Sequence, residues 1–325
     1  MVKTLDSIKQ PIAEELRDFE KHFRELMRSK VPLLDRITYY IVKRKGKQVR
    51  PMFVFLCAKL CGDDTEKVSF IGASLVEIMH TASLVHDDVV DDSYERRGFF
   101  SINALWKNKI AVLVGDYLLT QGLSLALKHK KYRLLHILSD AVQVMAEGEL
   151  LQMEKARRLD IKEEIYYDVI RGKTASLFAA ACSTGAAAVT EDEEVIEKMR
   201  LFGEKIGIAF QIRDDLFDFG TDDVGKPLGI DIKEKKMTLP LIYALENTDR
   251  STRRRMITNV KRHNEKKEKV REVIDFVLQS GGMEYAKQAM YQYRDEAFEI
   301  LHSFPPSEVR ESLEDLVNFV VERKK

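Results

Sequence analysis

The sequence predicts an all-α fold, a bundle of about ten or more helices, and three observations support this. The 325 residues include only seven prolines and sixteen glycines, the residues that interrupt helices. Apolar residues recur at intervals of three and four, as at Leu75, Ile78, Met79, Ala82 and Val85, which is the spacing of one helix face. Strict alternation of β-branched residues is not evident, so a βαβ or sandwich fold is not favoured.

Clusters of Gly, Pro, Asp, Ser and charged residues mark where the helices end. None is a Gly/Ser-rich or Pro-rich tract, so no flexible interdomain linker is expected, and the length fits one large domain or two smaller ones. The breaks fall at residues 29–32, 44–51, 62–64, 95–99, 128–131, 156–160, 190–193, 220–236 and 304–307.

Two segments between these breaks have an unusual composition. Residues 174–190 are the longest uncharged stretch, but they are Ala-rich and short of the roughly 20 apolar residues that a spanning helix needs. We therefore expect a buried helix that packs closely on its neighbours, and no transmembrane segment. The charged stretch 253–271 is expected to be a solvated helix surface or loop, with a basic partner-binding patch as the alternative.

Charge and cysteine content narrow the class of protein. Lys plus Arg and Asp plus Glu each number 53, so the overall charge does not favour binding to nucleic acid or to an anionic membrane. The cysteines Cys57, Cys61 and Cys182 are too few for a disulfide framework, and no secretory leader is evident, so a cytoplasmic location is expected. Cys57 and Cys61 are one helical turn apart, but without further thiol or His partners they are expected to be small buried hydrophobic residues.

A first aspartate cluster, Asp87-Asp88-Val89-Val90-Asp91, ends the apolar helical segment 70–85. Asp87 and Asp91 are four residues apart, so both carboxylates project from one helix face. Repulsion among them is strengthened by the apolar surroundings. A bound cation would relieve it.

A second cluster, Asp214-Asp215-Leu216-Phe217-Asp218, repeats the pattern 127 residues later (214 minus 87), after the apolar run 206–212. A single such motif is more often a solvated helix face. Two copies, each ending a helix fit for burial, favour a paired cation site. Carboxylates without nearby Cys suit a hard ion such as Mg²⁺, which fills its coordination sphere with water and substrate phosphate. An EF-hand is disfavoured because its Gly and Glu spacing is absent.

Basic motifs flank both clusters, and Arg and Lys are the usual partners of phosphate. Each motif alone is a weak signal, whereas the combination with paired aspartates strongly indicates diphosphate binding. The basic elements are residues 46–51, 96–98, 172–174 and Lys226.

With these motifs the sequence closely resembles the trans-prenyl diphosphate synthases, or polyprenyl synthetases. The resemblance covers roughly residues 30 to 325 and implies an isoprenoid synthase bundle around a central cavity, in a single domain over residues 1–325. It also implies a homodimer that condenses an allylic diphosphate primer with isopentenyl diphosphate. The motifs, in the family's order, are GKxxRP at 46–51, HDDxxD at 86–91, RRG at 96–98, GKT at 172–174, FQxxDDxxD at 210–218 and GK at 225–226.

The resemblance implies roles for individual residues. Mg²⁺, as three ions when diphosphate is bound, would be held by Asp87, Asp91 and Asp214, with Asp88, Asp215 and Asp218 completing or orienting the shell. The allylic diphosphate would contact Arg96, Lys173, Gln211 and Lys226, and isopentenyl diphosphate would contact Lys47, Arg50, His80 and Arg97. Thr174 and Gln211 would face the developing cation, and Lys236 would add a substrate contact. The catalytic set is thus Asp87, Asp88, Asp91, Lys173, Thr174, Gln211 and Asp214.

Two positions depart from the family pattern. The chain reads Gly229-Ile230-Asp231 where an Asp-Asp pair is common, and Lys235-Lys236 where a Gly usually precedes the Lys. Contacts from this loop to metal or substrate are less strongly implied. His80 has an alternative role as a hydrogen-bonded helix histidine, although its place two turns before Asp87 favours substrate binding.

The implied reaction uses metal and basic groups to stabilise the leaving diphosphate, which leaves an allylic carbocation in a dry cavity. The double bond of isopentenyl diphosphate attacks this cation, and loss of a proton to the departed diphosphate gives an allylic product five carbons longer. No nucleophilic triad is needed, and none is recognisable.

Product length should depend on the helix before Asp87, since a rise of about 1.5 Å per residue places Val76 roughly 16 Å below it. Short-chain members carry bulky aromatics where this chain has Ala82 and Ser83, and the first cluster lacks their common two-residue insertion. An octaprenyl-like medium or long product for a quinone side chain is expected, with a short-chain farnesyl or geranylgeranyl synthase as the alternative. Met79, with Leu75, Val76 and residues 118–123, would line the deeper floor.

Three other classes of protein fit the motifs less well. A terpene cyclase would replace the second cluster with an Asn/Ser/Glu motif, and a noncatalytic subunit of a heteromeric synthase would usually lack part of the motif set. A helical scaffold with acidic faces does not account for the joint pattern. No nucleic-acid partner is expected, and membrane contact would be transient, for product release.

Overall fold

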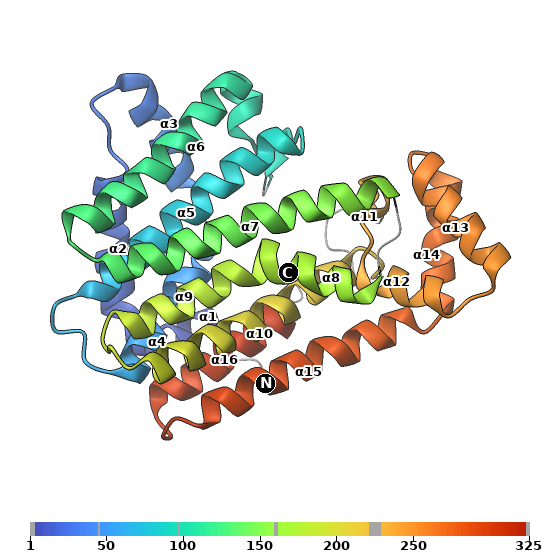
Figure 1. The fold of residues 1–325 in the computed structure, drawn as a ribbon. Coiled ribbons are helices and arrows are strands. Elements are labelled where there is room, and N and C mark those ends of the chain that lie inside the picture. The colour runs from blue at the N-terminus through green and yellow to red at the C-terminus, as the bar shows by residue number, and fades with distance from the viewer. Residues whose placement is uncertain (1–3, 45, 97, 159–161, 221–228, 323–325) are drawn as a thin grey trace.

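The structure is a computed structural model that describes residues 4–44, 46–96, 98–158, 162–220 and 229–322. Apart from one short hairpin, the regular elements of these residues are helical, which confirms the predicted all-α fold (Figure 1). The helices are α1 (Leu5–Ile8), the 3₁₀ turn η1 (Gln10–Ile12), α2 (Ala13–Leu26), α3 (Pro32–Lys43), α4 (Val49–Cys61), α5 (Val68–Val90), α6 (Ile102–Lys128), α7 (Tyr132–Arg158), α8 (Glu163–Ile170), the π-helical turn η2 (Arg171–Ala175), α9 (Ser176–Ala187), α10 (Glu193–Phe217), α11 (Ile230–Lys233), α12 (Leu239–Glu246), α13 (Arg250–Arg262), α14 (Lys267–Gln279), α15 (Gly282–His302) and α16 (Glu308–Glu322).

Local sequence signals account for several helix starts. Asp192 caps α10 by accepting a hydrogen bond from the backbone N–H of Glu194 at 2.9 Å, and Asp249 caps α13 through Ser251 at 2.8 Å. Pro32 opens α3, where its missing N–H has no cost. The helix starts at Asp192 and Pro32 coincide with predicted breaks, whereas the start at Asp249 was not predicted.

Helix α9 lies in the middle of the bundle, with α4, α7 and α10 packed around it (Figure 1). Glycines of α10 allow this close approach: a Cβ added at Gly203 would collide with Phe178, and one at Gly207 with Ala175. Larger side chains at these positions would push the two helices apart. The expected buried and closely packed helix within residues 174–190 is confirmed.

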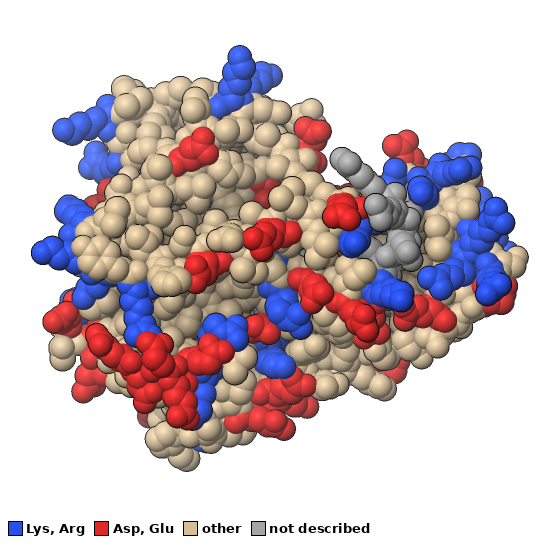
Figure 2. Space-filling view, viewed as in Figure 1, with Lys and Arg blue, Asp and Glu red and all other residues tan. Residues whose placement is uncertain are grey.

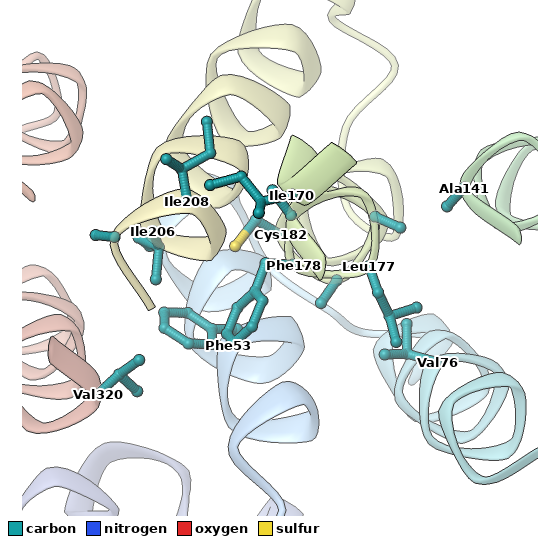
Figure 3. Packing of buried hydrophobic residues seen from close by; sticks show 14 of the residues in the cluster. Phe53, Val76, Ala141, Ile170, Leu177, Phe178, Cys182, Ile206, Ile208 and Val320 are labelled. Carbon is teal, nitrogen blue, oxygen red and sulfur yellow. The ribbon is translucent and has the colours of Figure 1, made fainter. Parts of the chain in front are cut away.

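Aromatic side chains fill the core beside α9 (Figure 3). Phe53 of α4 packs edge-on against Phe178, with ring centroids 5.9 Å apart, and against Phe202 at 6.4 Å. Cys57 and Cys182 are buried in the same region, and burial raises the pKa of the Cys57 thiol well above its ordinary value. Cys57 therefore acts as a small apolar residue, as expected.

A two-stranded hairpin stands where the sequence predicted only a break at residues 95–99. Strand β1 (Glu95–Arg96) pairs antiparallel with β2 (Phe99–Phe100), and Gly98 lies between them with φ 76°. The alternating pattern that identifies strands cannot be seen over two residues. The hairpin matters because it carries Arg96.

The C-terminal third contains breaks that were not predicted, at residues 247–249, 263–266 and 280–281. They separate α12 to α15, and α13 and α14 project from the bundle as a pair (Figure 1). Apolar residues such as Met256 and Val273 are buried in this pair, while most of its charged residues are exposed. This agrees with the expected solvated helix surface.

Helices α5 and α6 are long and apolar enough, by length and composition alone, to cross a membrane. In the bundle, 61% of the apolar window of α5 is buried, but only 39% of that of α6. Helix α5 is thus a core helix, whereas α6 leaves an apolar face uncovered.

Candidate active site

The first aspartate cluster forms the end of α5. Asp87 and Asp88 lie in its last turn, and the backbone N–H of the exposed Asp91 closes that turn on the carbonyl of Asp87 at 2.8 Å. Burial raises the pKa of Asp87 to about 6; Lys173 opposes this shift, whereas Glu149 and Asp91 add to it. The carboxylate therefore lies between charges of both signs, which suits the binding of a cation.

Asp88 is the buried member of the cluster, with 4% of its surface exposed. It accepts a hydrogen bond from Nε of Arg96 at 2.6 Å, and Asn103 donates to its backbone carbonyl at 3.1 Å. Burial raises the pKa of Asp88, and Arg96 partly offsets this. The hairpin thus holds Arg96 against the first cluster.

The second cluster forms the end of α10. Asp214 is half-buried, Asp215 is buried, and Asp218 follows the last turn. Burial raises the pKa of Asp218 to about 6, and the nearby Asp231 raises it further, although Asp231 also donates its backbone N–H to Asp218 at 3.2 Å. Helix α11 therefore contacts this cluster through the backbone of Asp231.

Asp215 is saturated with protein donors. Its oxygens accept from the hydroxyl of Tyr166 at 2.7 Å, from Nε2 of Gln211 at 3.1 Å and from the backbone N–H of Leu239 at 3.2 Å. Burial raises its pKa to about 7, with Asp231 adding to the shift and these donors opposing it. Of the two roles expected for Asp215, this arrangement favours orienting the metal shell over direct coordination.

Two lysines lie among the acidic residues near the first cluster. Lys173, in the π-helical turn η2, forms an ion pair with Glu149 of α7 and acts on the charge of Asp87. Burial lowers the pKa of Lys236, but Asp231, Glu234 and Asp91 outweigh it and hold that pKa above its ordinary value. Lys236 therefore lies within the field of Asp91 of the first cluster and of the acidic residues Asp231 and Glu234.

These side chains surround a cavity of about 170 Å³. At the wall of this cavity, the hydroxyl of Thr174 donates a hydrogen bond to Oε1 of Gln211 at 2.8 Å. The structure thus brings together residues from four distant segments. Those with candidate roles are Lys173, Thr174, Gln211, Asp215, Asp231 and Lys236.

A second cavity, of about 110 Å³, lies beside α5 and is lined by residues that include His80, Asp88 and Arg96. Arg50 bonds to Nε2 of His80 at 3.0 Å and stacks over the ring of Phe178 at 4.8 Å. The hydrogen bond accommodates both roles considered for His80, and it places Arg50 and His80 together as expected.

The remaining predicted residues lie elsewhere. Lys47 is exposed, with its ammonium 5.0 Å from the ring centroid of Phe319. Arg97 and Lys226 lie outside the described residues. Among the three chain-length residues, Met79 and Ala82 are buried and Ser83 is half-buried, and none of them lines the two cavities above.

Sequence reasoning missed Glu149 and Tyr166. The signal for Glu149 is the preceding Gly148, where an added Cβ would lie 2.7 Å from the backbone nitrogen of Lys173. Only a glycine lets α7 approach η2 so closely. Asp231 was noted as a departure from the family pattern, and its contacts with Asp218 and, at 3.8 Å, with Lys236 show that the loop still reaches the site.

Within the described ranges, no three His, Cys, Asp or Glu side chains converge as a ready-made metal cage. Mg²⁺ usually takes one or two carboxylates and completes its octahedron with water and phosphate oxygens. One or two carboxylates from each of the ends of α5 and α10 fit that pattern.

The raised carboxyl pKa values predict how stability depends on pH without metal. Folding raises the pKa of Asp215 from about 3.9 to about 7, so its stabilising contribution is complete below about pH 4 and is lost as pH rises through about 7. Asp215→Asn removes this loss. We expect the melting temperature of the variant, relative to wild type, to increase by roughly 2 to 6 °C between pH 5 and pH 8. Calorimetry with chelator measures it; a difference that is constant with pH would contradict the assignment.

Known proteins resemble this chain over nearly its whole length. The family described as Polyprenyl synthetase matches residues 31–277. An all-trans-nonaprenyl-diphosphate synthase (geranyl-diphosphate specific) of Rhodobacter capsulatus is 35% identical, with 96% of each chain covered. Octaprenyl diphosphate synthase of Escherichia coli is 35% identical, with 98% of this chain and 99% of the relative covered.

Solved structures agree with this. Polyprenyl synthase from Caulobacter crescentus, complexed with calcium and isoprenyl diphosphate, superposes with a TM-score of 0.91 and 31% identity, covering 100% of this chain and 99% of the other. The similar proteins also include some named geranylgeranyl diphosphate (or pyrophosphate) synthase, a name that denotes a shorter product.

Proposed function

The chain belongs to the polyprenyl synthetase family, and we propose that its two aspartate clusters together bind the diphosphate of an allylic substrate through divalent cations. Its activity is that of a trans-prenyltransferase, which condenses an allylic diphosphate with isopentenyl diphosphate in successive head-to-tail steps. The observation that carries the assignment of the site is that Lys173 and Lys236, which act on the charges of Asp87 and Asp91 of the first cluster, line one cavity together with Asp215 of the second.

The ligands proposed for the cations are Asp87, Asp91 and Asp214, with Asp88 and Asp215 orienting the others and Asp218 at the edge. The family is metal-dependent, and Mg²⁺, as three ions, is the form that we propose. When bound, the metal supplies charge neutralisation of the leaving diphosphate.

The protein's own groups then act on the organic part of the reaction. Lys173, Arg96 and Lys236 hold the allylic diphosphate, while Arg50 and His80, already in contact, hold isopentenyl diphosphate. Thr174 and Gln211 line the cavity that also holds Lys173 and Lys236, and they face the developing cation. Lys47, Arg97 and Lys226 are proposed as further diphosphate contacts.

The product is of medium or long chain, as it is for the octaprenyl, nonaprenyl and heptaprenyl synthases that this chain resembles. We propose an octaprenyl-like product for a quinone side chain. The small buried Ala82 supports this, because no bulky aromatic side chain occupies its position in α5.

The decisive experiment is an assay of purified protein with Mg²⁺, isopentenyl diphosphate and primers of several lengths, followed by sizing of the products. We expect turnover that disappears with chelator and products of about 35 to 45 carbons, the heptaprenyl to nonaprenyl range. No turnover with any primer would instead favour a noncatalytic subunit of a heteromeric synthase.

We also propose a homodimer formed through α6 and α7. Large apolar side chains of these helices are exposed, including Leu113 (63%), Leu127 (52%) and Leu150 (66%). The surface over α6 in Figure 2 is mostly tan, whereas acidic groups lie along α7. A contiguous apolar surface of this kind is typical of a subunit interface.

Leu113→Asp is expected to convert this dimer to a monomer, since a buried unpaired charge at an interface costs several kcal/mol. Light scattering should show the mass falling from 75 kDa (2 × 37.5) to 37.5 kDa. Leu278→Asp, at a 43% exposed position of α14, is the matched control and should leave the mass unchanged. An unchanged mass for Leu113→Asp would place the interface elsewhere.

We also propose that the enzyme is cytosolic and contacts the membrane transiently to release its product. The free thiols of Cys57, Cys61 and Cys182 are consistent with a reducing compartment.

A further inference from the structure

Four side chains that line the active-site cavity form a continuous chain of hydrogen bonds. Tyr166 of α8 donates its hydroxyl to Oδ2 of Asp215 at 2.7 Å, and Gln211 donates from Nε2 to Oδ1 at 3.1 Å. Thr174 donates to Oε1 of Gln211 at 2.8 Å. Tyr166 and Asp215 are each only 4% exposed, so water does not compete for these bonds.

The chemistry of Asp215 fixes the direction of every bond in this chain. A carboxylate only accepts hydrogen bonds, so the Gln211 amide must turn its NH₂ group toward Asp215. Its carbonyl oxygen is then left for Thr174, whose hydroxyl hydrogen must point at it. The backbone N–H of Leu239 adds a third donor to Asp215 at 3.2 Å.

We propose that Tyr166 and Asp215 are positioning residues that, by fixing the Gln211 amide, turn the lone pairs of the Thr174 hydroxyl toward the cation that develops in the cavity. With its hydrogen committed to Gln211, Thr174 presents only the negative end of its hydroxyl dipole to the substrate. A dipole oriented before the reaction stabilises charge without reorganisation. This role rests on the proposed prenyl transfer. It gives a function in that reaction to Tyr166, which lies outside the family motifs.

Tyr166 acts by holding the carboxylate still. Without its hydroxyl, Oδ2 of Asp215 keeps only the longer bond from Leu239, so the carboxylate and the amide that depends on it gain freedom. The diphosphate contacts of Lys173 and Lys236 do not involve this chain. The loss should therefore appear in turnover rather than in substrate binding.

The test compares Tyr166→Phe with Tyr285→Phe at pH 8. Tyr285 also donates its hydroxyl to a carboxylate, that of Glu163 at 2.6 Å, but it does not line the active-site cavity. We expect kcat to fall by about 10- to 50-fold in Tyr166→Phe, with KM for both diphosphates within about threefold, and no such fall in Tyr285→Phe.

A binding measurement separates positioning from general damage. An allylic diphosphate analogue with an ammonium nitrogen in place of the cationic carbon should bind about 5- to 10-fold more weakly to Tyr166→Phe, while an unreactive neutral analogue binds unchanged. Equal weakening of both analogues, or a kcat equal to that of Tyr285→Phe, would overturn the inference.

If Tyr166→Phe does not fold, Asp215→Asn provides the same comparison, because an amide at 215 lets the Gln211 amide reverse. Because Asp215 also orients the metal shell, both analogues should bind Asp215→Asn more weakly, but the ammonium analogue should lose several-fold more affinity than the neutral one. Equal losses would overturn the inference. Absence of turnover in the wild-type enzyme would contradict the proposed function itself, whereas active wild type with an unaffected Tyr166→Phe contradicts only the positioning role.

Discussion

Asp87→Asn is expected to lower kcat/KM by about a thousandfold. Asp87 is the carboxylate of the first cluster whose pKa is lowered by the charge of Lys173. Its pKa of about 6 leaves it ionised at pH 8. Removing its charge takes away a proposed metal ligand, and a bound metal contributes several kcal/mol to stabilising charge in the transition state. Each 1.4 kcal/mol corresponds to about a tenfold change in rate. Steady-state kinetics over a range of Mg²⁺ concentrations measures the effect.

Asp92→Asn is the matched control for this variant. Asp92 lies five residues further along the same acidic segment, but it is exposed and has φ 48°, a left-handed conformation that Asn adopts readily. It should retain wild-type activity. Equal losses in the two variants, or a Mg²⁺ requirement that does not rise in Asp87→Asn, would show that Asp87 is not a ligand.

The part of the site that lies along single helices could be predicted from the sequence. Spacing alone placed Asp87 and Asp91 on one face of α5, and Asp214 and Asp218 on one face of α10. The small residues of 174–190 likewise predicted a buried helix, since Ala and Gly permit close packing wherever the helix lies.

Contacts between distant segments could not be predicted in the same way. The bond from Tyr166 to Asp215 joins residues 49 apart, and nothing in the local sequence of either indicates the other. The hairpin that holds Arg96 against Asp88 is too short to have a periodic pattern. Only tertiary packing, which brings α5, α7, α8 and α10 together, determines these pairs.

Product length is the other property in which a single substitution should have a large effect. Helices α5 and α6 pack closely, with Met79 next to Gly122, where an added Cβ would lie 2.8 Å from the methionine methyl group. About two turns further along α5, His86 packs against Gly115 of α6. Ala82 therefore faces the middle of α6, near the buried Leu118.

Ala82→Phe should shorten the product to roughly 15 to 20 carbons, because Ala82 lies only about 7.5 Å along the helix from Asp87. A phenyl ring there occupies the space into which a growing chain would descend between α5 and α6. Ser83→Phe should act in the same direction. Leu84→Phe, on the opposite face of α5 beside the second cavity, is the control and should leave the length distribution unchanged. Chromatography of the dephosphorylated products measures the length distribution. Identical distributions in wild type, Ala82→Phe and Ser83→Phe would show that the growing chain follows another path. Shortening in Ala82→Phe and Ser83→Phe, but not in Leu84→Phe, would place the cavity floor on this face of α5.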